Sequence, residues 1–370
     1  MRLKVSVIIL LSLLVTGSQA KTKRSFKEKL IAFLDSSNVS GTDPRYIALP
    51  ERPWRVVLGN NTEQLNLTME SHSEQPSANS LGFNSFDFSM TVKPPLGNSI
   101  GLWAGYRGWG LGYSVSLTGN KGINLSFNIS TPTNGVNVSA HRFEFSNPSF
   151  ALHNLKFGEV DLDDIESSGE ALSEPMKIES LVLDAYWVFN NKRFSLAAPY
   201  GQSTLQLRSV GSLIAGLMFY YQKFDFSQNK NFVIAAFSNN VGSLKVYQGS
   251  LGVGYTYNWV PARNWTFNVV FMPVVSLLNK VKYSNYEIEF DEEKASDEDP
   301  FEGMVMTHIG DVSHHGKMRI NLDTRAAISY WWKRFSFGVV GQGHRFITSF
   351  ENTEVKLFDW EIKASLGYNF

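Results

Sequence analysis

The 370-residue chain contains no cysteine. Exported proteins from disulfide-forming compartments usually use some cysteines as staples, especially when they are small. A long chain without any cysteine must therefore be stabilised by interactions other than disulfide bonds.

An excess of charge of either sign is also missing, because the sequence has 34 basic and 34 acidic residues. Proteins that bind nucleic acid need positive charge to neutralise phosphates. The near-neutral balance gives no electrostatic case for nucleic-acid binding, and we expect no such partner.

Long apolar runs are missing beyond the amino terminus. The longest, Val269–Leu278, contains Pro273 and is well short of the ~20 residues that a helix needs to cross a bilayer. The sequence therefore excludes helical membrane spans from the mature chain.

The amino terminus has the features of a secretion signal. Arg2 and Lys4 precede the largely apolar stretch Val5–Val15, and a small-residue site ends at Ala20. This order is typical of a cleaved signal peptide, and the apolar stretch is too short for the alternative, an uncleaved membrane anchor. We therefore expect residues 1–20 to be removed on export.

Residues 21–53 form the next expected segment. Within it, Arg24–Asp35 spaces its apolar side chains at roughly helical intervals, and Pro44, Pro50 and Pro53 follow. This pattern predicts a short amphipathic helix in the periplasm, then a lead-in to a first strand near Trp54.

Apolar and polar residues alternate over most of residues 54–370, which predicts β-strands. The apolar face could be the core of a soluble sandwich, or the lipid-facing surface of a transmembrane barrel with a polar interior. The alternating stretches are Phe86–Val92, Ile100–Tyr106, Trp109–Leu117, Ile123–Ile129, Leu181–Phe189, Leu213–Tyr221, Leu251–Trp259, Ile320–Tyr330 and Phe335–Phe346.

Two features favour the barrel. Aromatic residues gather at the predicted strand ends, as in the girdles that lie at the headgroup level of a bilayer. Tight turns alternate with long polar loops, as in barrels with short periplasmic turns and long outer loops. The aromatic residues are Tyr106, Trp109, Trp259, Trp265, Tyr330, Trp331 and Trp332; the turns are Arg107–Gly108, Gly119–Gly122, Pro261–Asn264 and Trp331–Arg334; the loops include Ser146–Glu179 and Tyr283–Gly316.

The last stretch, Phe358–Phe370, gives the most specific signal. Every second residue in it is apolar or aromatic, and the chain ends on Phe370. This resembles the signal by which the barrel assembly machinery recognises bacterial outer-membrane proteins. Such a strand must pair with the first one, because lipid does not tolerate unpaired backbone groups. We expect it to run toward the periplasm, which places Tyr283–Gly316 outside the cell.

The expected fold is an all-β, antiparallel transmembrane β-barrel in the outer membrane of a Gram-negative bacterium, in contact with outer-membrane lipid. Bacterial single-chain barrels have even strand numbers. The stretch Asn190–Gly211 is ambiguous, so the expected number of strands is 12 or 14.

Two stretches resemble a known family. Asp43–Trp54 (DPRYIALPERPW) and Tyr186–Ser212 (YWVFNNKRFSLAAPYGQSTLQLRSVGS) are similar to Gram-negative outer-membrane proteins catalogued as domain of unknown function 4421. The likeness runs from roughly residue 40 to the end and implies a transmembrane barrel. It brings no catalytic or ligand-binding residues, so it leaves the function open.

Polar and charged residues fall on the inward phase of the last three strands, which makes them candidate lumen-lining residues. They could form a plug of ion pairs, line an aqueous channel that selects by charge, or supply a catalytic acid–base pair. These residues are Asp323, Arg325, Gln342, His344, Asp359, Glu361 and Lys363.

Catalysis is the weakest of these hypotheses. A lipid hydrolase would need a serine activated by a histidine. Ser336 lies on the same strand as His344 but eight residues away, about 26 Å, which is beyond hydrogen-bond reach. Ser329 on the preceding strand stays open as a partner. We expect no enzyme, no cofactor and no metal centre.

The strongest charge run, Glu287–Pro300, is expected in an outer loop. It could collect divalent cations, which bridge lipopolysaccharide phosphates, or attract cations toward a pore. A solvated loop is the simpler interpretation, because the spacing of a calcium-binding loop is missing.

A passive pore for small solutes is the function that the sequence favours. The alternatives are a structural or surface-interaction barrel with a plugged lumen and acidic outer loops, and a lipid-acting enzyme. The expected barrel lies between those of about eight strands, which side chains fill, and those of roughly 16 to 18, which leave a channel. The inward side chains therefore decide between pore and plug.

Overall fold

The computed structural model describes residues 29, 31–35, 41–73, 85–118, 123–131, 134–157, 160–161, 163–167, 175–227, 240–291, 303–350 and 352–370. The chain divides into two units, residues 1–37 and 38–370. In the first, residues 29 and 31–35 are helical. Among the described residues, no helix is long and apolar enough to span a membrane. The predicted signal peptide and the predicted turn at 119–122 lie outside the described residues.

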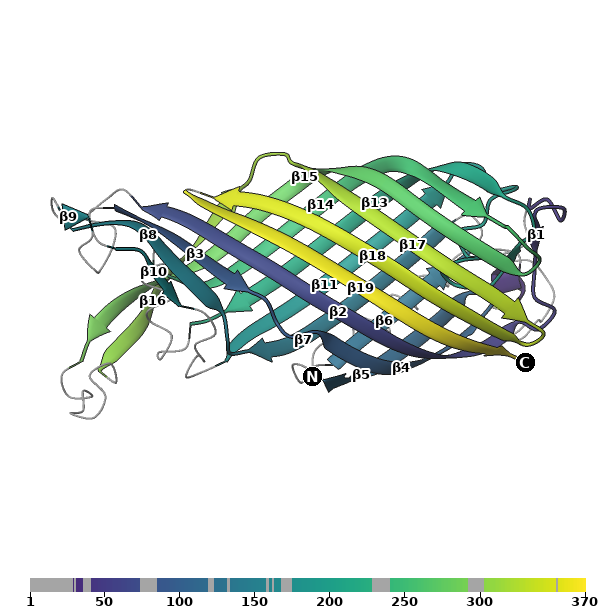
Figure 1. The fold of residues 1–370 in the computed structure, drawn as a ribbon, viewed down its shortest axis with the longest axis horizontal. Helices are drawn as coiled ribbons and strands as arrows, with labels where there is room; N and C mark the ends of the chain where they lie inside the picture. The colour runs from purple at the N-terminus through teal and green to yellow at the C-terminus, as the bar shows by residue number, and fades with distance from the viewer. Residues whose placement is uncertain are drawn as a thin grey trace. The chain divides into compact units, whose positions relative to one another are not determined.

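The second unit is an antiparallel β-sheet that closes on itself, with strongly slanted strands (Figure 1). In the described part of the chain, twelve strands form a ring in which each pairs with the next and the last pairs with the first. They are β2 (Trp54–Ser73), β4 (Gly97–Tyr106), β5 (Trp109–Thr118), β6 (Ile123–Ser130), β7 (Asn134–Phe145), β11 (Met176–Val188), β13 (Val210–Asp225), β14 (Val241–Trp259), β15 (Trp265–Phe290), β17 (Ile320–Trp332), β18 (Phe335–Phe350) and β19 (Thr353–Asn369).

The final strand closes the ring, as its alternation predicts. β19 pairs with β2 along its whole length, from Thr353 opposite Ser71 to Asn369 opposite Arg55, and the two strands lie side by side in Figure 1. This pairing gives backbone partners to the two strands that would otherwise be the edges of the sheet. The predicted all-β transmembrane barrel fold is confirmed.

Tight turns join neighbouring strands at one end of the barrel, which we call the turn end. Arg107 and Gly108 both have positive φ, as expected for a two-residue hairpin turn. Asn264 and Lys333 also have positive φ in their turns. The predicted turns at residues 107–108 and 261–264 therefore form, and the third is limited to residues 333–334 because Trp332 still belongs to β17.

The opposite end, the loop end, contains more strand than the sequence predicts. The predicted loops at residues 146–179 and 283–316 are wrong in part, because both contain strands. Their polar character reflects exposure to water rather than a lack of structure. The added strands are β8 (Ser149–Phe157), which pairs with the predicted strand β3 (Ser85–Val92), itself paired with β2; β9 (Val160–Asp161) and β10 (Ile165–Ser167), which pair with β8; and β16 (Met304–His315), which pairs with β15.

The acidic run at residues 287–300 was also predicted as loop. Its first residues, up to Phe290, continue β15, and residues 292–300 lie outside the described part of the chain. The described acidic side chains of the run therefore lie on or directly after a hairpin strand.

Apolar side chains cover the outside of the barrel. Val253 on β14, for example, is 63% exposed. At the turn end aromatic rings meet along the rim, such as Trp54 with Tyr106 (5.0 Å between ring centroids) and Trp265 with Tyr330 (4.7 Å). An exposed apolar surface bordered by aromatic rings matches the lipid-facing surface of a membrane barrel. Other exposed apolar residues are Leu102, Leu111, Leu213, Leu217, Leu251, Val269, Phe271, Ile328, Val339 and Ile362.

The interior corrects a second expectation, that of a polar lumen. Toward the loop end it is filled by a packed apolar layer, in which Tyr220 stacks on Phe346 with ring centroids 4.6 Å apart. Alternation failed to predict this because β13 carries apolar residues on both faces there. Further members of the layer are Leu67, Met69, Phe86, Phe88, Phe224, Val246, Val355 and Leu357.

A charge on the lipid-facing side should destabilise the barrel strongly. We expect Val253→Arg to lower the free energy of unfolding in vesicles by about 2–4 kcal/mol, the cost of a cation near the bilayer midplane. Ala262→Arg, in an exposed turn, is the control and should change it by about 1 kcal/mol or less. Equal effects of both substitutions in urea titrations would contradict the assigned lipid face.

Candidate functional site

A chain segment folds into the barrel at the turn end. We call residues 189–209, between β11 and β13, the inward segment. It is rich in small side chains, and Phe194 and Ala197 within it are fully buried. Three of its residues bond to inward side chains of different strands: Asn258 Nδ2 on β14 donates to Ser195 O (2.9 Å), Tyr200 Oη donates to Asn268 Oδ1 on β15 (2.7 Å), and Ser329 Oγ on β17 donates to Ala198 O (3.3 Å).

The inward segment also reaches the opposite wall. The guanidinium group of Arg55 on β2 donates to Gly201 O and Gln202 Oε1, and Gln202 Nε2 lies 3.5 Å from Ser365 Oγ on β19. A Cβ added at Gly338 would overlap the amide end of the Gln202 side chain, which would have to move to accept a larger residue there. The segment therefore crosses the interior near the turn end, from β14, β15 and β17 to β2 and β19.

A second segment holds the inward segment in place. Within the lead-in segment, residues 43–53, β1 (Ile47–Ala48) pairs with β12 (Leu205–Gln206). Leu207 N donates to Tyr46 O (2.8 Å), and the guanidinium groups of Arg193 and Arg208 lie over the Tyr46 ring. The two stretches that carry the family resemblance thus pack against each other.

Gln206 connects the two segments and the wall through its side-chain amide. Its Oε1 accepts from Ser195 N (2.9 Å) and from Asn258 Nδ2 (3.0 Å). Its Nε2 lies within donating distance of three carbonyl oxygens, those of Tyr46 (3.1 Å), Arg193 (2.7 Å) and Arg208 (3.1 Å). One buried amide therefore fixes both segments to each other and to β14.

The lead-in segment has an ionic contact outside the membrane-spanning strands. Hydrogen bonds from the Arg45 side chain and backbone lower the pKa of Asp43 to about 2. Because this pKa lies below its ordinary value of 3.8, the contact contributes above about pH 4 and is lost only as the pH falls toward 2. It is therefore intact throughout the physiological pH range.

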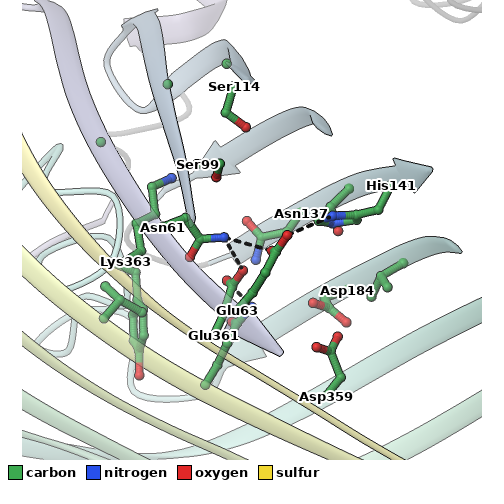
Figure 2. Close-up of a pocket in the computed structure, with 18 of the residues that line it drawn as sticks. Asn61, Glu63, Ser99, Ser114, Asn137, His141, Asp184, Asp359, Glu361 and Lys363 are labelled. Carbon is green, nitrogen blue, oxygen red and sulfur yellow. Dashed lines mark hydrogen bonds and ion pairs between the residues drawn. The ribbon is translucent and has the colours of Figure 1, made fainter. Parts of the chain in front are cut away.

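Between the inward segment and the apolar layer lies a cavity of about 330 Å³, lined by charged, polar and apolar side chains (Figure 2). The order of side chains along β2 shows this layering. Arg55 contacts the inward segment, Asn61 and Glu63 line the cavity, and Leu67 belongs to the apolar layer. Other polar lining residues are Ser99, Ser114, Asn137, His141, Ser180 and Asp184.

Glycine provides much of the space on one side. The inward positions of β4 and β5 include Gly101 and Gly112, which both line the cavity. A Cβ at Gly101 would lie 2.7 Å from Cβ of Ser114, so the two strands meet there at a distance that a larger residue would not allow. The cavity therefore extends to the backbone of this wall.

The strand register arranges the charged residues in two rows across neighbouring strands. Strand pairing places Arg325, Gln342, Glu361 and Glu63 opposite one another in turn on β17, β18, β19 and β2. The adjacent row contains Asp323, His344 and Asp359. Both rows face the interior because their positions share the inward phase of the strands.

One end of these rows is a buried cluster around Arg325. Its guanidinium group lies 3.2 Å from Asp184 Oδ2 and 3.3 Å from Asp323 Oδ1, and it also donates to Tyr186 Oη. Tyr186 Oη in turn lies 3.1 Å from Asp323 Oδ2, and His344 Nδ1 lies 3.3 Å from Asp323 Oδ1. The carboxylates of Asp184 and Asp323 thus share one buried cation, the guanidinium group of Arg325.

At the other end of the two rows, fewer cationic side chains lie beside the carboxylates. Glu361 accepts from Gln342 Nε2 and from Asn61 Nδ2 (3.3 Å). His141 Nδ1 lies 3.7 Å from Glu63 Oε1. The carboxyl groups at this end therefore have mainly amide and imidazole neighbours.

Six of the seven residues predicted to line the lumen line this cavity: Arg325, Gln342, His344, Asp359, Glu361 and Lys363. Asp323 lies behind them and is fully buried. Sequence reasoning missed Asn61, Glu63, His141 and Asp184, because these lie on β2, β7 and β11, far along the chain from the closing strands. The pairing of β19 with β2 was the signal that could have led to Glu63.

The serine left open as a partner for His344 does not approach it. Ser329 pairs with Gly338, six residues before His344, which is about 20 Å along the strand. Its hydroxyl group instead contacts the inward segment. Among the described residues, no cluster of three His, Asp or Glu side chains is arranged to hold a metal ion.

Removal of the Arg325 guanidinium group should leave two buried carboxylates without a cation. We expect Arg325→Met to lower the free energy of unfolding by about 3–5 kcal/mol, measured by urea titration of the reconstituted barrel. Arg142→Met, which breaks an exposed 3.6 Å pair with Glu179, is the control and should cost about 1 kcal/mol or less. A similar small loss for Arg325→Met would contradict the charge cluster.

Comparisons with known proteins place the chain in a family. No relative among curated proteins matches its sequence. Similar solved structures include the outer-membrane protease OmpT of Escherichia coli (9% identity, 87% of this chain and 98% of that chain, TM-score 0.42), the toluene transporter TodX of P. putida (7%, 90% and 94%, 0.26) and the transport unit of the autotransporter AIDA-I of Escherichia coli (8%, 92% and 97%, 0.32). Residues 60–370 match the family model described as domain of unknown function (DUF4421), so the chain belongs to that family.

Proposed function

We propose that the protein is an integral barrel of the outer membrane of a Gram-negative bacterium and lets small polar solutes cross it passively through a gated central cavity. The closed sheet with its apolar outer surface supports residence in a membrane, because only closed barrels and helices satisfy their backbone groups in lipid. The secretion signal at residues 1–20 supports export. In this proposal the turn end faces the periplasm.

The cavity is the observation that carries the proposal. Protein interiors are packed densely, with few voids larger than a water molecule. A barrel with a purely structural role could fill its centre in the way that the apolar layer fills the loop end. Here a space of about 330 Å³ is retained, bordered by charged side chains and glycine as well as by apolar side chains. Such a space suits a solute that dwells inside the barrel.

The two closures differ in how they could open. The apolar layer is made of side chains on the wall strands, so passage through it needs rotamer changes such as separation of Tyr220 from Phe346. The inward segment is a piece of chain, attached to the wall strands at its two ends and otherwise held by hydrogen bonds and by the packing of Phe194 and Leu196. It can withdraw as a unit without breaking the barrel. We therefore assign the gate to the inward segment.

A disulfide between the inward segment and the wall should lock the gate. The chain has no cysteine, so Ala198→Cys with Ser329→Cys introduces the only thiols, at positions already in contact. We expect the oxidised variant to show no conductance steps in a planar bilayer. Reduction should release the segment and restore the steps of the unmodified protein.

Ser195→Cys with Thr204→Cys is the matched control. These hydroxyl groups lie 2.7 Å apart within the inward segment, so their disulfide should leave the conductance unchanged. Steps that persist in the oxidised Ala198–Ser329 variant would exclude the segment as the gate. A barrel that inserts but stays silent in every state would instead support the alternative, a plugged structural or surface-interaction protein.

Loss of the amide at position 206 should loosen the gate. Gln206→Leu removes the hydrogen bonds that join the inward segment, the lead-in segment and β14, so we expect the open probability to rise several-fold in single-channel recordings. Asn279→Leu, a buried amide on β15 that bonds to Lys317 and Thr348 and not to the inward segment, is the control and should behave as wild type. An equal response of the two variants would count against a specific latch at Gln206.

A further inference from the structure

We infer that the cavity selects small organic cations, such as solutes with a guanidinium or ammonium group. This inference rests on the proposed function, because it concerns the same cavity. It adds the chemical class of the solute. It follows from the charges on the cavity wall, from the partners that these charges already have, and from one buried carboxylate oxygen.

The lining carries four carboxylates, Glu63, Asp184, Asp359 and Glu361. Three cationic side chains also line the cavity, but two of them are already engaged. The guanidinium group of Arg55 donates to the inward segment, and that of Arg325 binds Asp184 and Asp323. The acceptors of Arg55 are neutral, so its charge still counts beside those of Arg325 and Lys363. The four lining carboxylates, with Asp323 buried behind them, nevertheless outnumber these three cations.

Asp184 lines the cavity, and only one of its two carboxylate oxygens has a hydrogen-bond donor among the described residues. Its side chain is only 5% exposed, and Oδ2 accepts from Arg325. Its other oxygen, Oδ1, is buried and has no hydrogen-bond partner among the described residues. A buried carboxylate oxygen without a donor is costly, so this position favours a ligand that brings an N–H group.

Asp359 lies across the cavity from it. Figure 2 shows the carboxyl groups of Asp184 and Asp359 pointing toward each other, from β11 and β19. In the described part of the chain, Asp359 makes no hydrogen bond or ion pair. A group placed between the two carboxylates would therefore meet two acceptors at once.

A guanidinium or ammonium group fits this position chemically. It carries one positive charge and several N–H donors, so it can bond to both carboxylates with charge-assisted hydrogen bonds. No three-ligand metal cluster exists among the described residues, which favours an organic cation over a bare metal ion. The volume of about 330 Å³ lies at the small end of known ligand pockets, so the solute must be small.

Neutral hydrogen-bonding groups would hold the rest of the solute. Ser99, Ser114 and Asn137 line the side of the cavity that adjoins the glycine wall. These groups accept and donate hydrogen bonds without adding charge. An anionic solute would meet the facing carboxylates and be repelled, whereas a neutral one would leave both of them without a cation.

Equilibrium dialysis of the refolded full mature chain tests this preference and allows for slow entry past the inward segment. The probes are n-butylguanidinium and n-butylurea, which have nearly the same shape but differ by one charge. We expect the cation to bind about tenfold more tightly or better, the loss that a missing charge-assisted hydrogen bond produces. Asp359→Asn should weaken binding of the cation by a similar factor.

Glu354→Gln is the matched control, because this residue lies on the same strand but pairs with Lys356 away from the cavity. It should bind the cation as wild type does. If Asp359→Asn fails to fold, as judged by heat-modifiable mobility on a gel, Glu361→Gln replaces it and should weaken binding in the same direction. Equal binding of the two probes, absence of binding, or full binding by the folded cavity variants would overturn the inference.

The dialysis result is independent of conductance. A barrel that conducts but binds both probes equally would keep the proposed passage and overturn the cation preference. A barrel that binds the cation through Asp359 but never conducts would keep the preference and overturn the passage.

Discussion

The pairing of β19 with β2 is the interaction on which the rest of the structure depends. In lipid, a backbone N–H or C=O without a partner costs several kcal/mol, so an open sheet edge cannot persist there. The pairing also fixes the register, and a slip of one residue would turn every side chain of a strand to the other face. The row that joins Glu361 to Glu63 exists only in this register. The register that closes the sheet therefore also determines which side chains line the cavity.

The parts of the fold that sequence could predict are those set by local pattern. The closing strand was predicted from the alternation that ends at Phe370. The hairpin turn at Arg107 and Gly108 was predicted from its short sequence between two alternating stretches. The inward direction of Asp359 follows from the same alternation. In each case the physical cause lies within a few residues of the effect.

The parts that escaped prediction depend on contacts between distant residues. The inward segment has no periodicity because its groups are satisfied by hydrogen bonds to side chains of the wall, such as Ser329 and Asn258, and not by a strand ladder. The apolar layer escaped because alternation reports a difference between two faces and fails where both are apolar, as around Tyr220. The position of Asp359 opposite Asp184 could be known only from the closed ring.

The contact between the lead-in and inward segments has a consequence for assembly. Tyr46 and Gln206 are separated by 160 residues, and a pair of two-residue strands is too small to be stable alone. Loop closure over such a length costs entropy that only the surrounding wall can offset. We therefore expect the lead-in and inward segments to dock late, after the strands on both sides of them have paired. A barrel that stalls during insertion would lack its inner closure, so the seal at the turn end would mark a completed molecule.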